Sequence, residues 1–121
     1  MNPRLLVVED EPALQKVLAM RLGMEGFDVR TASDGQEALE LIREEAPDLV
    51  LTDLMMPVMD GAELTRSIKS DPALKAIPVL VLTALKEKRE RDHLVGLGAS
   101  GFASKPYNSV ELTAKIRELL A

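Results

Sequence analysis

The sequence predicts an α/β fold in which a single doubly wound, five-stranded parallel sheet, with strand order 2-1-3-4-5, carries five helices on both faces. Short apolar runs alternate with segments of helical periodicity five times along the chain. The strongest of these runs are nearly continuous, which is typical of strands buried on both faces of a parallel sheet. At 121 residues the chain is near the usual size of one domain, so we expect one domain over residues 1–121.

The first strand is expected at Leu5–Val8, a continuous apolar run. The first helix follows Pro12, a residue that suits a first helical turn, and ends near Gly26. Its apolar residues recur at the spacings of an amphipathic helix: Leu14, Val17, Leu18 and Leu22. The second strand, Asp28–Ala32, is a weaker candidate, and we expect it at an edge of the sheet.

The second helix is expected to begin with the residues Ser33 to Gln36, which fit a capping box, and to end at Pro47. Its helical pattern is carried by Ala38, Leu39 and Ile42. The third strand contains the apolar run Leu49–Leu51. The third helix shows two turn residues followed by an apolar pair: Asp60, Gly61, Leu64 and Ile68.

The fourth strand is expected at Val79–Leu82, followed by a helix over roughly Glu87 to Leu97 that ends at Gly98. Gly101–Ser104 is a second weak strand, expected at the other edge. The fifth helix has a capping box and then an apolar pattern: Asn108, Glu111, Leu112, Ile116 and Leu119.

The composition excludes several functional classes. A formal net charge of −5 opposes attraction to phosphate backbones or anionic lipid, so we expect no direct nucleic-acid partner and no membrane association. The chain has no Cys, which excludes disulfides and thiolate metal sites. The N-terminus lacks an apolar segment of signal-peptide length, and we expect a cytoplasmic protein.

Polar side chains follow the carboxyl ends of four of the expected strands. In a parallel sheet these ends lie along one edge, where ligands bind in open α/β folds. In chain order the acids, the hydroxyl and the amine are Glu9, Asp10 and Glu11, then Asp53, then Thr83, then Lys105. We therefore expect these groups to meet in one pocket.

If the first and third strands are neighbours, Asp10 and Asp53 face each other, and such close like charges require a proton or a cation. An all-oxygen site suits Mg²⁺, with Mn²⁺ as a substitute. The only His is His93, in the fourth helix, so metals that prefer imidazole lack ligands. Asp53 can then attack phosphorus while Lys105 and Thr83 hold phosphoryl oxygens.

Four motifs stand at these strand ends: Leu6-Val7-Val8-Glu9-Asp10-Glu11, Thr52-Asp53-Leu54-Met55-Met56-Pro57-Val58-Met59-Asp60-Gly61, Leu82-Thr83-Ala84 and Ser104-Lys105-Pro106. In this order and spacing, over essentially its whole length, the chain resembles a bacterial two-component response-regulator receiver domain. This family has a flavodoxin-like fold and includes the chemotaxis regulators. Residues 1–121 are thus expected to form one receiver, or phosphoacceptor, domain.

The resemblance implies that Asp53 is the phosphoacceptor, with Thr83 and Lys105 as the other catalytic groups. The metal ligands it implies are Glu9, Asp10, Asp53 and the backbone carbonyl of Met55. The phosphoryl donor would be a phosphohistidine on a sensor histidine kinase or a histidine phosphotransfer protein. Such a domain is not an enzyme but a signalling domain that assists its own phosphorylation and dephosphorylation.

The resemblance also implies a switch. Thr83 moves toward the phosphate, Phe102 turns into the space released, and Ala84 leaves room for this movement. The bond between Lys105 and Pro106 is typically cis in this fold. An output protein or domain would contact the fourth helix, fifth strand and fifth helix, and the chain would be a monomer or a phosphorylation-dependent dimer. The stimulus, the kinase and the output stay open, and we expect any output domain outside these 121 residues.

Two other functions are weighed against this one. A Mg²⁺-dependent phosphatase of the haloacid-dehalogenase type would carry a general acid two residues after its nucleophile, where this chain has Met55. A flavin- or nucleotide-binding module would need a Gly-rich loop after the first strand. It would also need aromatic residues for stacking, and these make up 2% of the chain.

Overall fold

The computed structural model describes residues 2–84, 88–105 and 107–121. Within these residues, one parallel sheet has the strand order β2-β1-β3-β4-β5. Its strands are β1 (Arg4–Val8), β2 (Asp28–Ala32), β3 (Leu49–Asp53), β4 (Val79–Thr83) and β5 (Gly101–Ser104). The predicted fold class and strand order are confirmed, and the two weaker candidates, β2 and β5, are the edge strands.

The helices alternate with the strands along the chain. They are α1 (Pro12–Met24), α2 (Gly35–Glu44), α3 (Gly61–Ser70), α4 (Lys88–Gly96) and α5 (Ser109–Leu120). In the part of the chain that the structure describes, no helix combines the length and apolar character needed to cross a bilayer.

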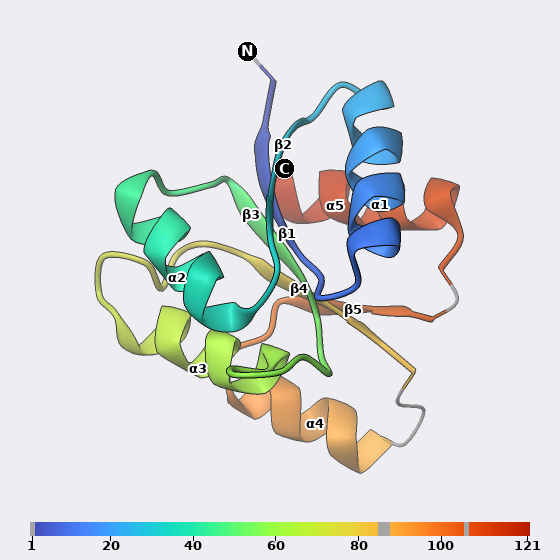
Figure 1. Cartoon of the computed structure of the whole chain (residues 1–121). Coiled ribbons are helices and arrows are strands. Elements are labelled where there is room, and N and C mark those ends of the chain that lie inside the picture. Colours follow the sequence, from blue (N-terminus) through green and yellow to red (C-terminus); the bar gives the residue numbers. More distant parts are fainter. Residues whose placement is uncertain (1, 85–87, 106) are drawn as a thin grey trace.

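Helices cover both faces of the sheet, with α1 and α5 on one side and α2, α3 and α4 on the other (Figure 1). Because side chains alternate along a strand, Leu6 and Val8 of β1 join the core beneath α2, α3 and α4. Leu5 and Val7 join the core beneath α1 and α5. Every residue of β3 and β4 is buried. A strand between two cores needs apolar residues at nearly every position, which explains the continuous apolar runs.

The burial of α1 differs from its predicted pattern. Leu18 and Leu22 are buried, but Leu14 and Val17 are 47% and 40% exposed. Leu18 and Leu22 lie one turn apart on a single line, whereas Val17 is rotated by about 100° from Leu18. Leu14 lies in the first turn of the helix. The helix therefore contacts the sheet along a narrower line than the spacing predicted.

The N-terminus of α2 is capped one residue later than predicted. The Oδ1 atom of Asp34, not the Ser33 hydroxyl, accepts a hydrogen bond from the Glu37 backbone N–H at 2.8 Å. The pair Asp34 and Glu37 has the spacing of a capping box, so two overlapping boxes are encoded here. The cap of α5 is the predicted one, because Asn108 Oδ1 accepts from the Glu111 N–H at 3.2 Å.

Candidate functional site

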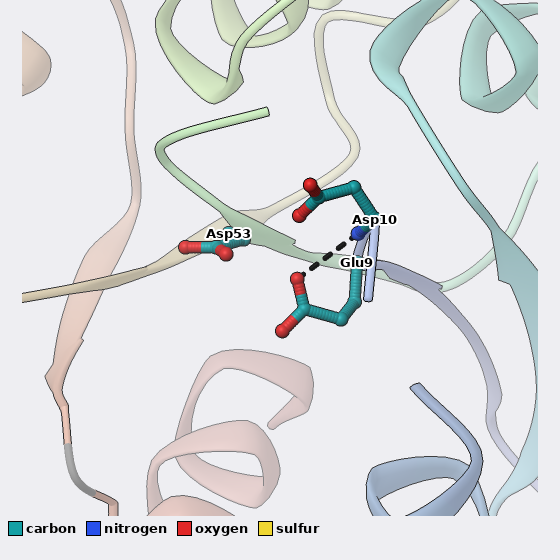
Figure 2. A group of neighbouring side chains, drawn as sticks. All are labelled: Glu9, Asp10 and Asp53. Atoms are coloured by element: carbon teal, nitrogen blue, oxygen red, sulfur yellow. Dashed lines mark hydrogen bonds between the residues drawn. The ribbon is translucent and has the colours of Figure 1, made fainter. Parts of the chain in front are cut away.

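The carboxyl ends of β1 and β3 bring the acidic residues together. The two strands are neighbours, and their register pairs Val8 with Thr52, so that Glu9 and Asp53 follow at adjacent positions. Figure 2 shows the side chains of Glu9, Asp10 and Asp53 converging on one space. Each offers a carboxylate oxygen, and these oxygens lie within 4.8 Å of one another. We call these three residues the acidic cluster.

Negative charge is unfavourable in the acidic cluster because two of its three carboxylates are buried. Glu9 and Asp53 are only 6% and 7% exposed, whereas Asp10 is exposed. Burial raises the pKa of Glu9 to about 7, the Asp53 carboxylate adds to the rise, and the Lys105 ammonium opposes it. A buried carboxylate beside another one favours a proton or a cation. The cluster is therefore prepared to bind positive charge.

Lys105 supplies one such positive charge directly to Asp53. Its Nζ lies 2.8 Å from Asp53 Oδ2 and 4.0 Å from Glu9 Oε1. Its backbone N–H donates to the Thr83 carbonyl at 3.1 Å, which continues the β4–β5 ladder by one residue and fixes where the side chain begins. The other Asp53 oxygen, Oδ1, accepts from the Leu54 N–H at 2.8 Å. Both oxygens of Asp53 are thus held by donors.

The loop after β3 is packed tightly against the backbone of Asp53. A Cβ atom on Gly61 would lie 2.4 Å from the Asp53 carbonyl oxygen, so only Gly allows α3 to begin this close to β3. Within the loop, the Met59 N–H donates to the Pro57 carbonyl at 2.7 Å across Val58, whose φ of 68° is rare for a β-branched residue. The compact loop restrains the backbone that carries the Asp53 side chain.

This geometry can be compared with known proteins. The protein-family model of the response regulator receiver domain matches residues 5–117 of this chain. The matched residues include the acidic cluster, Thr83 and Lys105. The chain belongs to the response regulator receiver family. It is accordingly a signalling domain of the two-component kind, and its fold is the flavodoxin-like fold of receiver domains.

Individual relatives agree with this assignment. The receiver domain is 42% identical over 117 residues to "Probable transcriptional regulator ycf27" of Guillardia theta, covering 97% of this chain and 45% of the relative. It is 41% identical over 119 residues to response regulator PleD of Caulobacter vibrioides, covering 98% of this chain and 26% of PleD. It therefore spans less than half the length of these two curated relatives.

The solved structure of chemotaxis response regulator CheY4 of Vibrio cholerae matches the receiver domain with a TM-score of 0.93 and 28% identity. The match covers 98% of this chain and 99% of the CheY4 chain. The similarity therefore extends over the whole fold rather than over one motif.

The donor set of the acidic cluster fits a hard divalent cation. It consists of carboxylate oxygens, which are the ligands that Mg²⁺ prefers. Met55 follows Asp53 by two residues and is 76% exposed, and the predicted ligand there is its backbone carbonyl. His93 lies on α4 with an exposed side chain. Receiver domains bind Mg²⁺ in an acidic pocket, and this cluster has the composition of one.

The other predicted site residues differ in burial. Thr83 is buried at the end of β4, one residue beyond the register pair of Asp53 with Leu82. Ala84 is exposed, and Phe102 is half-buried against the core beneath α2, α3 and α4. Glu11, expected near the other acids, is exposed at the start of α1 and is not part of the acidic cluster. The prediction for Pro106 concerns a residue outside the described part of the chain.

Gln15 is a polar contact of the site that sequence reasoning missed. It lies in α1, and its Nε2 donates to the backbone carbonyls of Glu9 and Ala32 at 2.9 and 3.0 Å. No motif marks this residue. Its position six residues after Glu9 becomes meaningful only once the path from β1 into α1 is known.

Proposed function

We propose that this receiver domain, with residues 1–121 acting as one unit, accepts a phosphoryl group on Asp53 in a Mg²⁺-dependent reaction. The donor would be a phosphohistidine on a sensor histidine kinase or a histidine phosphotransfer protein. The surroundings of Asp53 carry this proposal. Its carboxylate lies 2.8 Å from Lys105 Nζ and shares the acidic cluster with Glu9 and Asp10.

The transfer forms a bond between an Asp53 oxygen and phosphorus as the bond from phosphorus to the imidazole nitrogen breaks. The nitrogen keeps the electron pair, and the phosphoryl oxygens carry the charge that must be stabilised. The Lys105 ammonium, already beside Asp53, meets part of that charge, and the Thr83 hydroxyl is a second donor at the end of β4. The domain thereby assists its own phosphorylation and dephosphorylation without being an enzyme acting on other molecules.

A bound Mg²⁺ ion, or Mn²⁺ in its place, would neutralise the acidic cluster and polarise a phosphoryl oxygen. The proposed ligands are Glu9, Asp10, Asp53 and the Met55 carbonyl. Asp10 is the exposed member of the cluster, so its carboxylate is the one that solvent reaches most easily.

The proposed response is a switch that links Asp53 to the face formed by α4, β5 and α5. Thr83 moves toward the phosphate and Phe102 turns inward, with Ala84 and Pro106 as the further switch residues. Thr83 and Phe102 belong to neighbouring strands, and Phe102 is half-buried, so an inward turn would increase its burial. An output protein or domain would read this face, with the receiver as a monomer or a phosphorylation-dependent dimer in the cytoplasm.

The test is intact-mass analysis after incubation with acetyl phosphate and Mg²⁺. We expect the wild-type chain to gain the mass of one phosphoryl group and Asp53→Asn to gain none. Asp28→Asn is the matched control, because Asp28 is an exposed Asp at the opposite end of the sheet, and it should be phosphorylated like the wild type. Equal phosphorylation of Asp53→Asn, or none of the folded wild type, would falsify the proposal.

A further inference from the structure

Gln15 connects the ends of two strands next to the acidic cluster. Its Nε2 donates to the Glu9 carbonyl at 2.9 Å, just past β1, and to the Ala32 carbonyl at 3.0 Å, at the end of β2. The same nitrogen lies 3.5 Å from Ser33 Oγ. An amide nitrogen has two hydrogens, so the two carbonyls use its full donor capacity. Gln15 is itself half-buried, which strengthens its need for these partners.

The carbonyl of Glu9 belongs to the peptide group that joins Glu9 to Asp10. The N–H of this peptide, on Asp10, donates to Glu9 Oε2 at 3.0 Å, the contact drawn in Figure 2. Because a peptide group is planar and trans, a donor that fixes its carbonyl also fixes the direction of its N–H. Gln15 therefore sets the direction of the N–H that holds the Glu9 carboxylate.

The consequence reaches both acidic side chains that follow β1. The Glu9 carboxylate is held through its Oε2, and its Oε1 is the atom 4.0 Å from Lys105 Nζ. Asp10 starts from the same peptide, so the direction of its side chain depends on the same restraint. The Glu9 N–H donates to the Ala32 carbonyl at 3.0 Å and holds the start of this segment, but without Gln15 the Glu9 carbonyl would have more freedom, and cation binding would have to order it.

We propose that Gln15 is a positioning residue for the cation site: it holds the peptide between Glu9 and Asp10 so that both carboxylates face Asp53. This inference rests on the proposed Mg²⁺-dependent function. Gln15 does not touch the ion or the phosphoryl group, and it acts only through the Glu9 carbonyl. It corresponds to the outer-shell hydrogen bonds that orient metal ligands in other proteins, whose loss weakens metal affinity by about 10- to 100-fold.

The test uses the variant Gln15→Met, which keeps the length and helix propensity of the side chain but removes both donors. The matched control is Gln36→Met, because Gln36 is an exposed Gln near the start of α2. Gln15→Asn, with an amide too short to reach both carbonyls, serves as a second loss variant if Gln15→Met does not fold.

The readout is Mg²⁺ affinity of the unphosphorylated chain, measured from the amide chemical shifts of Asp10 and Asp53 during a Mg²⁺ titration of isotope-labelled protein. We expect Gln15→Met to bind Mg²⁺ about 10- to 100-fold more weakly, with a shifted Asp10 amide signal before any Mg²⁺ is added. Gln36→Met should match the wild type. Unfolding temperatures measured in parallel separate this effect from a general loss of stability.

The possible failures are distinguishable. If the wild type binds Mg²⁺ and folded Gln15→Met binds it equally well, the positioning role is overturned and the proposed function stands. If the stability of Gln15→Met falls while its affinity is unchanged, Gln15 only ties α1 to the sheet, and the inference is again overturned. If the folded wild type itself binds no Mg²⁺ at the acidic cluster, both proposals fail together.

Discussion

The two ends of the sheet carry similar charged residues in opposite environments. At the amino end, Arg4 and Glu45 form an ion pair at 2.5 Å, and both side chains are about half exposed, at 52% and 51%. At the carboxyl end, the ion pair of Lys105 with Asp53 joins a side chain that is 32% exposed to one that is 10% exposed. A second buried carboxylate, Glu9, lies beside it. The amino end therefore has solvated charges, and the carboxyl end has an excess of partly desolvated negative charge.

This difference indicates that the burial of the charged side chains, rather than their residue type, makes the carboxyl end of the sheet a binding site. Water screens the exposed pair, and such pairs contribute roughly 0–1 kcal/mol to stability. Charges removed from water interact more strongly, and they are costly unless every one has a partner. The carboxyl end is short of positive charge, which favours the binding of a cation there.

The largest expected difference between the two ends of the sheet comes from removing the positively charged side chain at each end. Lys105→Met should slow phosphorylation of Asp53 by acetyl phosphate by about 100- to 1,000-fold, because a charged donor to the phosphoryl oxygens is lost. Arg4→Met removes the cation of the solvated pair and should change this rate little. The rates are measured by quenched mass analysis, and a loss of less than tenfold in folded Lys105→Met would contradict the role given to Lys105.

The second comparison concerns packing against the site. Gly61→Ala places a Cβ 2.4 Å from the Asp53 carbonyl oxygen and 2.9 Å from the Leu54 Cα, both backbone atoms that cannot move aside freely. We expect the free energy of unfolding to fall by about 1–3 kcal/mol. Gly23→Ala is the control, because a Cβ there has nothing within 4 Å, and in a helix it should stabilise by about 0.5–1 kcal/mol. Urea denaturation measures both, and an unchanged stability of Gly61→Ala would show that the loop is not tightly packed.

The third comparison concerns the pH dependence caused by Glu9. The pKa of Glu9 is raised from its ordinary value of 4.5 to about 7, so the folded chain binds this proton more tightly than the unfolded chain does. The stability from Glu9 is fully present below pH 4.5 and is lost as the pH rises through about 7. The Gln side chain of Glu9→Gln cannot ionise, so this variant does not lose stability in that pH range.

The measurement is the unfolding temperature of wild type and Glu9→Gln with a chelator present, across the range from about pH 5 to about pH 8. The stability of Glu9→Gln relative to wild type should rise with pH, because only the wild type loses stability as Glu9 ionises. Taking the difference between the two proteins removes the contribution of groups that titrate alike in both. Parallel curves would mean that the Glu9 carboxylate is not disfavoured by its surroundings. Added Mg²⁺ should reduce the difference by stabilising the ionised form in the wild type.

Local errors in the sequence prediction show which signals are incomplete. Ser33 and Asp34 both begin a capping box, and the choice of Asp34 depends on where the loop from β2 meets α2, which no local pattern specifies. The spacing of Leu14 and Val17 matches an amphipathic helix, yet both residues are exposed. Helical periodicity predicts a helix reliably, but it does not predict the width of the buried stripe.

The sequence by itself determined the order of strands and helices, the two-faced core and the residues at the strand ends, because apolar periodicity and chain direction are local properties. It did not determine the contacts made by one residue with partners far along the chain. The hydrogen bonds of Gln15 to Glu9 and Ala32, and the approach of Gly61 to Asp53, exist only after β1, β2 and β3 are side by side. The tertiary structure decided these contacts, since their geometry depends on how separate elements pack.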